Sequence, residues 1–217
     1  MTGFDGLLAT PAGQRVTGVA VGIVTSNADP LHLGRVRLRL PALSADVESG
    51  WALVLTPMAG PDRGLRLPPE EGDTVLVAFE NGDIDRPFVL GAFWTGSQKP
   101  PQADDSDHDL RLLRSRSGHV IRLDDTEGAG KIEIVDSSGK NTITIDTANN
   151  EITVHAAGPV TISADGDLKL GAKGNLTLEG NKVEVTAQQS LALKGTSRAE
   201  LTSQGALAVR GSVVDIN

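Results

Sequence analysis

The side chains that most often carry out catalysis or hold metal ions are few in this sequence and lie far apart. The chain has 217 residues, four histidines and no cysteine. The absence of cysteine excludes disulfide and thiolate-metal chemistry. The histidines are scattered at His32, His108, His119 and His155, and no serine lies in a G-x-S-x-G setting. The sequence therefore nominates no catalytic residue, no cofactor-binding residue and no metal ligand, and we expect no cofactor and no enzymatic activity.

Three segments resemble ligand-binding loops without meeting their requirements. The acidic run 104–109 lacks the glycine at the sixth position and the closing glutamate of an EF-hand. The segments 128–131 and 138–140 contain Gly and Lys but lack the upstream glycine, the following Ser/Thr and the helix of a phosphate loop. We interpret the first segment as an exposed linker and the other two as hairpin turns.

Composition favours an all-β protein that does not bind nucleic acid or anionic surfaces. Aromatic residues make up only 3%, there is no Tyr, and 25 glycines and 11 prolines accompany many Val, Ile, Leu and Thr residues. The formal net charge of -8 repels phosphate backbones and anionic membranes. The first 14 residues have no basic or continuous apolar stretch, so no signal peptide is predicted, and no window approaches a membrane span.

The first hundred residues alternate in the manner of short strands. We predict strands over 16–24, 34–40, 51–56, 74–79 and 87–94, bounded by Gly, Pro, Asn or Asp. In the second of these, Val36, Leu38 and Leu40 share one face while arginines 35, 37 and 39 share the other. Five short strands with one apolar face predict a small barrel.

The same region carries a family resemblance. Asp29-Pro30 followed by the block 33–41 (LGRVRLRLP) resembles the opening of the phage baseplate assembly protein V domain, and later blocks follow in the same order. These blocks are Trp51-Ala52, 58–60 (MAG), Gly64, 67–80 (LPPEEGDTVLVAFE), Gly82-Asp83 and 86–91 (RPFVLG). The match covers roughly residues 16–95. It implies the OB-fold-like barrel shared by tail spikes of contractile phages and the VgrG spike proteins of type VI secretion and related injection systems.

OB-fold barrels often bind single-stranded nucleic acid, which is the alternative reading of this domain. Such binding needs a basic groove with stacking aromatic side chains. The arginine stripe 35/37/39 is the one basic row, and its other interpretation is a solvated or subunit-contacting face. The aromatic residues lie mostly at core-facing or strand-end positions of an acidic chain, so we expect no nucleic-acid partner.

The second half is organised by an internal repeat. After a Pro-led acidic linker at 98–118, pairs of aliphatic residues recur as φ-x-φ couplets from Ile121/Leu123 to Val214/Ile216. The first members are 11, 11 and 9 residues apart, and from Ile152 onward they are 8, 8, 8, 7, 8, 8, 8 and 7 apart. Gly158, Gly166 and Gly174 repeat at the same interval of eight.

An octad with two inward aliphatic residues is too short for a solenoid of one chain, but three chains can each supply one side of a triangular prism. Such a prism leaves no open sheet edge and has room on its axis for only small aliphatic side chains. The spike β-helices of the resembled family have the same octad. The predicted axial residues are Ile152, Val154, Val160, Ile162, Leu168, Leu170, Leu176, Leu178, Val183, Val185, Leu191, Leu193, Leu207 and Val209.

The sequence thus predicts an all-β homotrimer: an N-terminal arm (1–15), an OB-fold-like barrel (16–97), a linker (98–118) and an intertwined triple-stranded β-helix (119–217). The predicted function is the central spike of a contractile injection machine, a phage tail, tailocin or extracellular injection system, that docks on a baseplate hub and pierces an envelope mechanically. Assembly in the producing cell's cytoplasm as part of a tail-like particle and transient contact with the target membrane are expected. A β-helical polysaccharide-processing enzyme is the second alternative.

A tip partner is the last expectation. The final couplet ends one residue before the end of the sequence, and no histidine cluster lies near it, in contrast to some spikes of the resembled type. We expect a small conical protein, similar to PAAR-repeat tips, to bind Val213, Val214, Ile216 and Asn217.

Overall fold

The computed structural model of the protein describes residues 15–101 and 108–216. Residues 1–14 of the expected N-terminal arm, residues 104–107 of the acidic run and Asn217 therefore lie outside the described residues. The chain divides into two units, Met1–Pro159 and Val160–Asn217, which we describe separately.

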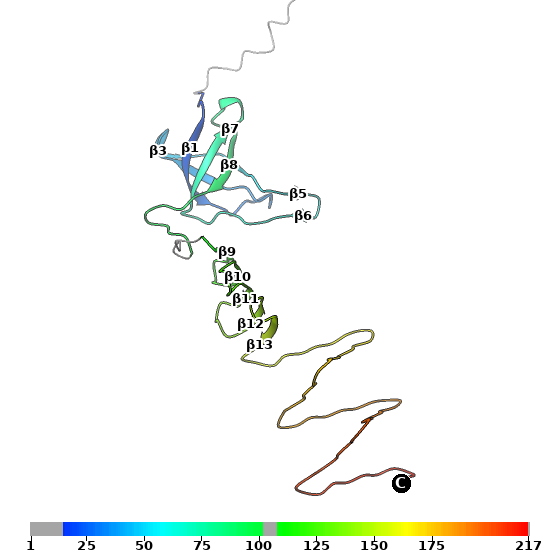
Figure 1. Ribbon diagram of the computed structural model, residues 1–217. Coiled ribbons are helices and arrows are strands. Elements are labelled where there is room, and N and C mark those ends of the chain that lie inside the picture. The colour runs from blue at the N-terminus through cyan, green and yellow to red at the C-terminus, as the bar shows by residue number, and fades with distance from the viewer. Residues whose placement is uncertain (1–14, 102–107, 217) are drawn as a thin grey trace, which may run out of the picture. The chain divides into compact units, whose positions relative to one another are not determined.

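The first unit begins with a six-stranded sheet that closes into a barrel (Figure 1). Its strand order is β3-β2-β1-β7-β8-β4, and every neighbouring pair is antiparallel except β4 with β8. Backbone hydrogen bonds in both directions between Val36 and Ala52, at 3.0 and 2.8 Å, join the β2 side to the β4 side and so close the barrel. The strands are β1 (Val19–Ser26), β2 (Arg37–Leu40), β3 (Ser44–Glu48), β4 (Leu53–Val54), β7 (Thr74–Phe79) and β8 (Pro87–Ala92).

Two connections between the barrel strands have local structure of their own. A separate two-stranded hairpin, β5 (Ala59–Gly60) and β6 (Arg63–Gly64), projects from the barrel between β4 and β7 (Figure 1). The short 3-10 turn η1 (Glu80–Gly82) joins β7 to β8 at the predicted Asn-Gly turn, where both Asn81 and Gly82 have positive φ.

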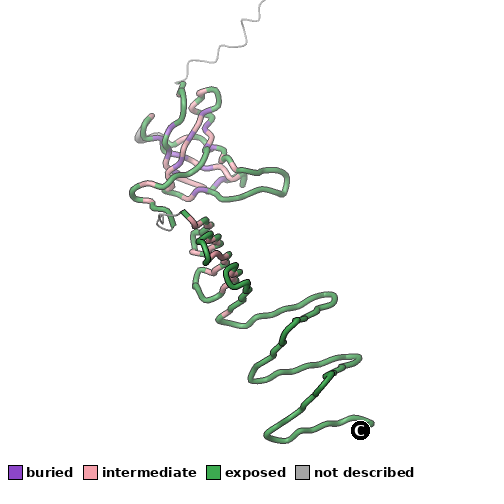
Figure 2. Tube along the Cα trace, viewed as in Figure 1, coloured by how far each residue is buried: buried purple, intermediate pink, exposed green. Residues whose placement is uncertain are grey.

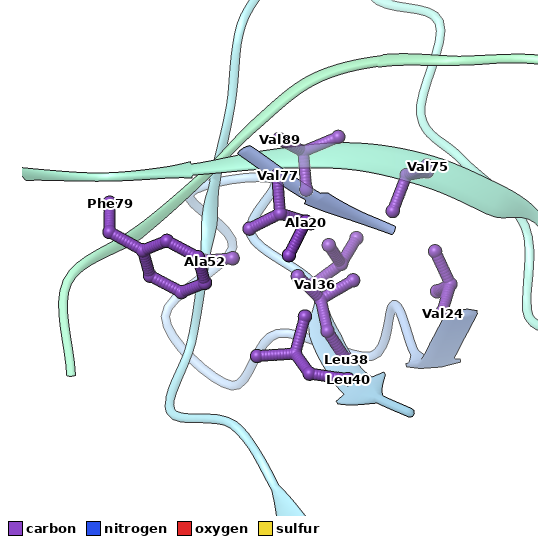
Figure 3. Packing of buried hydrophobic residues seen from close by; sticks show 10 residues of the cluster. All are labelled: Ala20, Val24, Val36, Leu38, Leu40, Ala52, Val75, Val77, Phe79 and Val89. Atoms are coloured by element: carbon purple, nitrogen blue, oxygen red, sulfur yellow. The ribbon is translucent and has the colours of Figure 1, made fainter. Parts of the chain in front are cut away.

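The barrel core is small and almost entirely aliphatic (Figure 3). Alternate residues of the strands point inward, and the predicted inward set Val36, Leu38 and Leu40 is confirmed, with Leu38 fully buried. Gly22 also faces inward, because a Cβ there would meet a Val77 methyl group at 3.0 Å. The core consists of Ala20, Val24, Val36, Leu38, Leu40, Ala52, Val75, Val77, Phe79 and Val89.

The loop between β1 and β2 is organised by one buried carboxylate. Asp29 accepts backbone hydrogen bonds from Leu31 at 3.0 Å and from Leu33 at 2.9 Å. Arg35 adds a bidentate ion pair to the same carboxylate. These bonds hold the pKa of Asp29 well below its usual range, the side-chain bond to Arg35 being the largest cause. The loop therefore has a fixed charged anchor on the way into β2.

The first unit continues as a second sheet of five strands, an antiparallel meander in the order β13-β12-β11-β10-β9. Its first strand lies within the segment 98–118 that the sequence places in the linker. The strands are β9 (Leu110–Arg114), β10 (Val120–Asp124), β11 (Lys131–Val135), β12 (Thr142–Asp146) and β13 (Glu151–His155). The turns at 128–130 and 138–140 connect these strands, so their interpretation as hairpin turns is confirmed.

This meander explains the irregular couplet spacing before Ile152. Spacings of 11, 11 and 9 arise because each couplet lies on a five-residue strand followed by a hairpin turn. Residues 120–155, which the sequence assigns to an intertwined β-helix, therefore pair within one chain as far as the described strands go.

The second unit has no strand among its described residues 160–216, and all of them are exposed (Figure 2). From the end of the meander onward, the extended chain bends at 157–158, 165–166, 173–174, 181, 188–189, 196–197, 204–205 and 212. The last residues of successive bends are eight positions apart, except for intervals of seven before 181 and before 212. The sequence places its two seven-residue steps at the matching couplets, so the octad is a feature of the backbone as well as of the residue pattern.

Candidate functional site: an uncovered apolar face

The apolar couplets of the meander gather on one face of the sheet in two rows. The pairing register places Ile121 opposite Ile134, Ile134 opposite Ile143, and Ile143 opposite Val154. The second row follows the same register and consists of Leu123, Ile132, Ile145 and Ile152. Cross-strand aliphatic pairs of this kind stabilise a sheet, but they also form a continuous apolar surface.

This surface is open to solvent in the single chain. Its residues are exposed, from 38% at Ile145 to 70% at Ile152. The opposite face of β10, β11 and β12 is the less exposed one, although it is more polar. There Arg122 pairs with Glu133 at 3.1 Å, and Lys131 lies 3.4 Å from the same carboxylate. The polar face therefore has side-chain partners within the chain, whereas the aliphatic face remains exposed to solvent.

The couplets of the second unit are equally uncovered. The predicted axial residues between Val160 and Val209 are exposed by 54% or more. Burial of an aliphatic side chain is worth about 1.5–3 kcal/mol, and an extended chain with no hydrogen-bonded neighbour loses that energy at each couplet. Its backbone N–H and C=O groups also need partners. An extended chain in this form therefore leaves both its apolar couplets and its backbone hydrogen-bonding groups without partners inside the chain.

Every described residue of the predicted axial set is thus placed on an exposed apolar row, and the structure does not bring the members after Val154 together within one chain. The predicted tip-binding residues Val213, Val214 and Ile216 are exposed as well, and Asn217 lies outside the described residues. Neither the axial role nor the tip role is tested by a single chain.

The arginine stripe of the barrel is occupied by contacts inside the chain. Arg35 pairs with Asp29, and Arg37 pairs with Glu48 at 2.7 Å. Both guanidinium groups also lie over the ring of Trp51, at 5.7 and 4.9 Å from its centre. Trp51 and two of the three arginines are therefore engaged within the chain and are not available as a stacking platform for bases. Asp29 and Trp51 both belong to the motif blocks of the sequence, but no local residue pattern indicates these contacts.

Metal-ligand clusters and membrane-spanning helices are lacking in the described part of the chain. Residues 15–101 and 108–216 contain no group of three or more His, Asp or Glu side chains placed to hold a metal ion. Over the same ranges no helix has the length and apolarity to cross a membrane.

The barrel and the open apolar rows define a class, an OB-type barrel followed by a β-structured segment with uncovered apolar rows. Comparison with known proteins agrees with this class. Residues 20–94 match the family described as type VI secretion system/phage-baseplate injector OB domain. This match shows that residues 20–94 form an injector OB domain, and the chain as a whole resembles the VgrG-like baseplate and spike proteins.

Similar proteins extend the match beyond the barrel. The chain is 27% identical over 125 residues to the type VI secretion system spike protein VgrG2a of Pseudomonas aeruginosa, which covers 52% of this chain and 15% of that protein. It is 27% identical over 172 residues to the actin cross-linking toxin VgrG1 of Vibrio cholerae, covering 75% of this chain and 14% of that protein. The spike protein VgrG3 of Vibrio cholerae is 28% identical over 107 residues, covering 48% and 10%. The chain thus spans about a tenth to a seventh of the length of these relatives.

Proposed function

We propose that this chain forms the central spike of a contractile injection machine, as a homotrimer in which three copies cover one another's apolar rows. The observation that carries the proposal is the pair of aliphatic residues repeated every eight positions on a backbone that bends at the same interval and has no partner of its own. Three copies would place these couplets around a common axis and pair the open strands.

The meander contributes to the same assembly. Three five-stranded sheets could turn their isoleucine-rich faces inward and leave the Arg122–Glu133 face in water. With about 4.8 Å between neighbouring strands, the five strands and the following octads would form a thin rod several tens of Å long. Such a rod transmits force by stiffness and shape. The proposed role is therefore mechanical puncture of a target envelope, with no catalytic step.

Further partners belong to the proposal because the resembled family assembles in this way. The barrel would dock on a baseplate hub, and a conical tip protein would cover Val213, Val214 and Ile216. The particle would assemble in the producing cell's cytoplasm. The nucleic-acid alternative is disfavoured by the internal pairing of Arg35 and Arg37 with carboxylates, and a polysaccharide-processing enzyme would leave the exposed octad unexplained.

Mass in solution tests the trimer directly. One chain weighs 22.6 kDa, so multi-angle light scattering should give three times that mass, about 68 kDa. A stable monomer whose far-UV CD spectrum shows β structure would refute the proposal. Pull-down of the candidate tip protein by the full chain and by a form truncated after Gly211 tests the tip separately, because equal capture by both would place the contact elsewhere.

A further inference from the structure

The outer wall of the barrel is apolar across four strands, unlike the wall of a barrel that stands alone in water. The pairing register places Val19 opposite Ala78, Ala78 opposite Phe88, and Phe88 opposite Leu53. Val21 opposite Leu76 begins a second row beside it. Val19 and Leu53, at the two ends of the first row, are 55% and 49% exposed. We call this surface the wall.

A second exposed apolar surface is the segment 55–68, which contains the β5–β6 hairpin and which we call the arm. It leaves the barrel directly after β4 and projects away from it (Figure 1). Only two residue pairs join its strands, with a hydrogen bond from the Leu65 N–H to the Met58 carbonyl at 3.1 Å. Isolated two-stranded ribbons are marginally stable. Its exposed apolar residues are Leu55, Met58, Leu65 and Leu67.

Charge distinguishes the two surfaces. The arm carries Arg63 and Arg66, and the loop that links β7 to β8 beside the Ala78–Phe88 pair carries Asp83 and Asp85. None of these four side chains forms an ion pair within residues 15–101. The arm also contains Asp62, so its net charge is +1, and the border of the wall carries the negative charges of Asp83 and Asp85.

Three-fold symmetry requires two different contact surfaces on each copy, because the interface in a ring of three is head-to-tail. The arm and the wall are such a pair. The arm leaves from β4, and Val19 and Val21 lie on β1 at the other end of the row. We propose, on the basis of the trimer proposed above, that the arm of each barrel packs across the β1–β7 wall of the next barrel. The occupant of the wall is thus a second copy of this chain.

Connection to the rod favours a contact between two barrels of the same trimer over a contact with a separate protein. Each barrel is joined to its meander by the short segment between β8 and β9, so assembly of the rod holds three barrels at high effective concentration. The contact would order the arm and cover the wall at once.

Engineered disulfides test the contact cleanly, because the protein contains no cysteine. Four double variants combine Met58→Cys or Leu65→Cys on the arm with Val21→Cys or Ala78→Cys on the wall. Mild oxidation should convert at least one of them into a covalent trimer on a non-reducing denaturing gel. Each single-cysteine variant is the matched control, since one cysteine per chain can give dimers but no closed ring.

The outcomes separate this inference from the proposed function. A native mass of three chains without cross-linking in any of the four double variants would overturn the arm contact and leave the spike proposal standing, and would assign the wall to another protein such as the hub. A monomeric mass would refute both.

Charge reversal provides a second readout. Arg63→Glu with Arg66→Glu should lower the cross-linking rate about twofold to fivefold at low salt, as expected for exposed ion pairs. Adding Asp85→Arg should restore part of that rate. No change in either variant would contradict the assigned orientation of the arm.

Discussion

Arg35 donates two hydrogen bonds to the carboxylate of Asp29, from Nε to Oδ2 at 3.0 Å and from Nη2 to Oδ1 at 2.7 Å. The pair is shielded from water, because the Asp29 side chain is 2% exposed and that of Arg35 is 18% exposed. The same Arg35 guanidinium lies over Trp51. The loop before β2, the first arginine of the stripe and a tryptophan are thereby joined in one contact network.

We expect Asp29→Asn to destabilise the barrel, because the amide cannot accept the bidentate ion pair and loses the charge that Arg35 needs. Trp51 reports on this region, so urea unfolding can be followed by fluorescence in a Trp94→Phe background. Asp62→Asn, at an exposed aspartate with no ion pair in the described barrel, is the control and should leave the midpoint unchanged.

The same pair predicts an acid sensitivity. Since the pKa of Asp29 is lowered in the folded barrel, its contribution is complete above the unfolded value of about 4 and is lost as the pH falls below it. The stability difference between the parent and Asp29→Asn should therefore shrink at acidic pH. A difference that grew on acidification would contradict the assigned sign.

We expect Ile162→Asp to abolish the trimer or lower its thermal stability strongly. If Ile162 lies on the axis, three carboxylates meet there, and desolvation and like-charge repulsion each cost about several kcal/mol. Ser163→Asp is the matched control, because neighbouring residues of an extended chain point to opposite sides. Equal mass and melting temperature in the two variants would show that the assignment of the couplets is wrong.

The arm should be sensitive at Gly64 and tolerant at Gly60. A Cβ on Gly64 would lie 2.7 Å from the Met58 carbonyl oxygen, which is backbone and cannot move without opening the hairpin. A Cβ on Gly60 would approach only the flexible Arg63 guanidinium. Limited proteolysis should therefore cut the arm faster in Gly64→Ala than in Gly60→Ala. The same rate in both would mean that the hairpin is not held by this close approach.

The Asp136 carboxyl, in the turn between β11 and β12, should have an unusually low pKa. The Ser138 hydroxyl donates to both Asp136 oxygens, at 2.9 and 2.8 Å, and Asn141 adds a side-chain bond at 2.8 Å. These bonds lower the pKa of Asp136 to about 2. Carboxyl NMR titration should show that Ser138→Ala raises the pKa, while Ser137→Ala does not. The turn should thus keep its bonds down to about pH 2 and lose them below it.

Local residue patterns were sufficient to predict a small barrel and five of its strands, but not β3 or the β5–β6 hairpin. The 74–79 strand and the inward set Val36, Leu38 and Leu40 follow from period-two alternation, which depends only on neighbouring residues. The meander could not be separated from the octad segment in the same way, because both show φ-x-φ couplets. The pairing of Ile121 with Ile134 depends on hairpin turns whose effect is visible only as a longer spacing.

Contacts between residues distant in sequence were harder to predict. The alternation alone presents the three arginines as one uniform face. In the structure Arg37 pairs with Glu48 and lies over Trp51, which are 11 and 14 positions further along the chain. The apolar wall was missed for the same reason. Val19 and Leu53 are 34 positions apart and become one surface only through the intervening strands β7 and β8.

The bends at intervals of eight have a consequence for how such a chain can change length. Removal of eight residues between two bends, such as 167–174, would join one corner to the next and leave all later side chains pointing as before. Removal of one residue from the middle of a side would invert the side chains up to the next bend, where the two natural intervals of seven show that a one-residue change can be absorbed. Removal of four would keep the alternation but move each corner to the middle of a side. In the proposed trimer, insertions and deletions of whole octads would therefore make this segment a molecular ruler, each changing its reach by about one strand spacing of 4.8 Å.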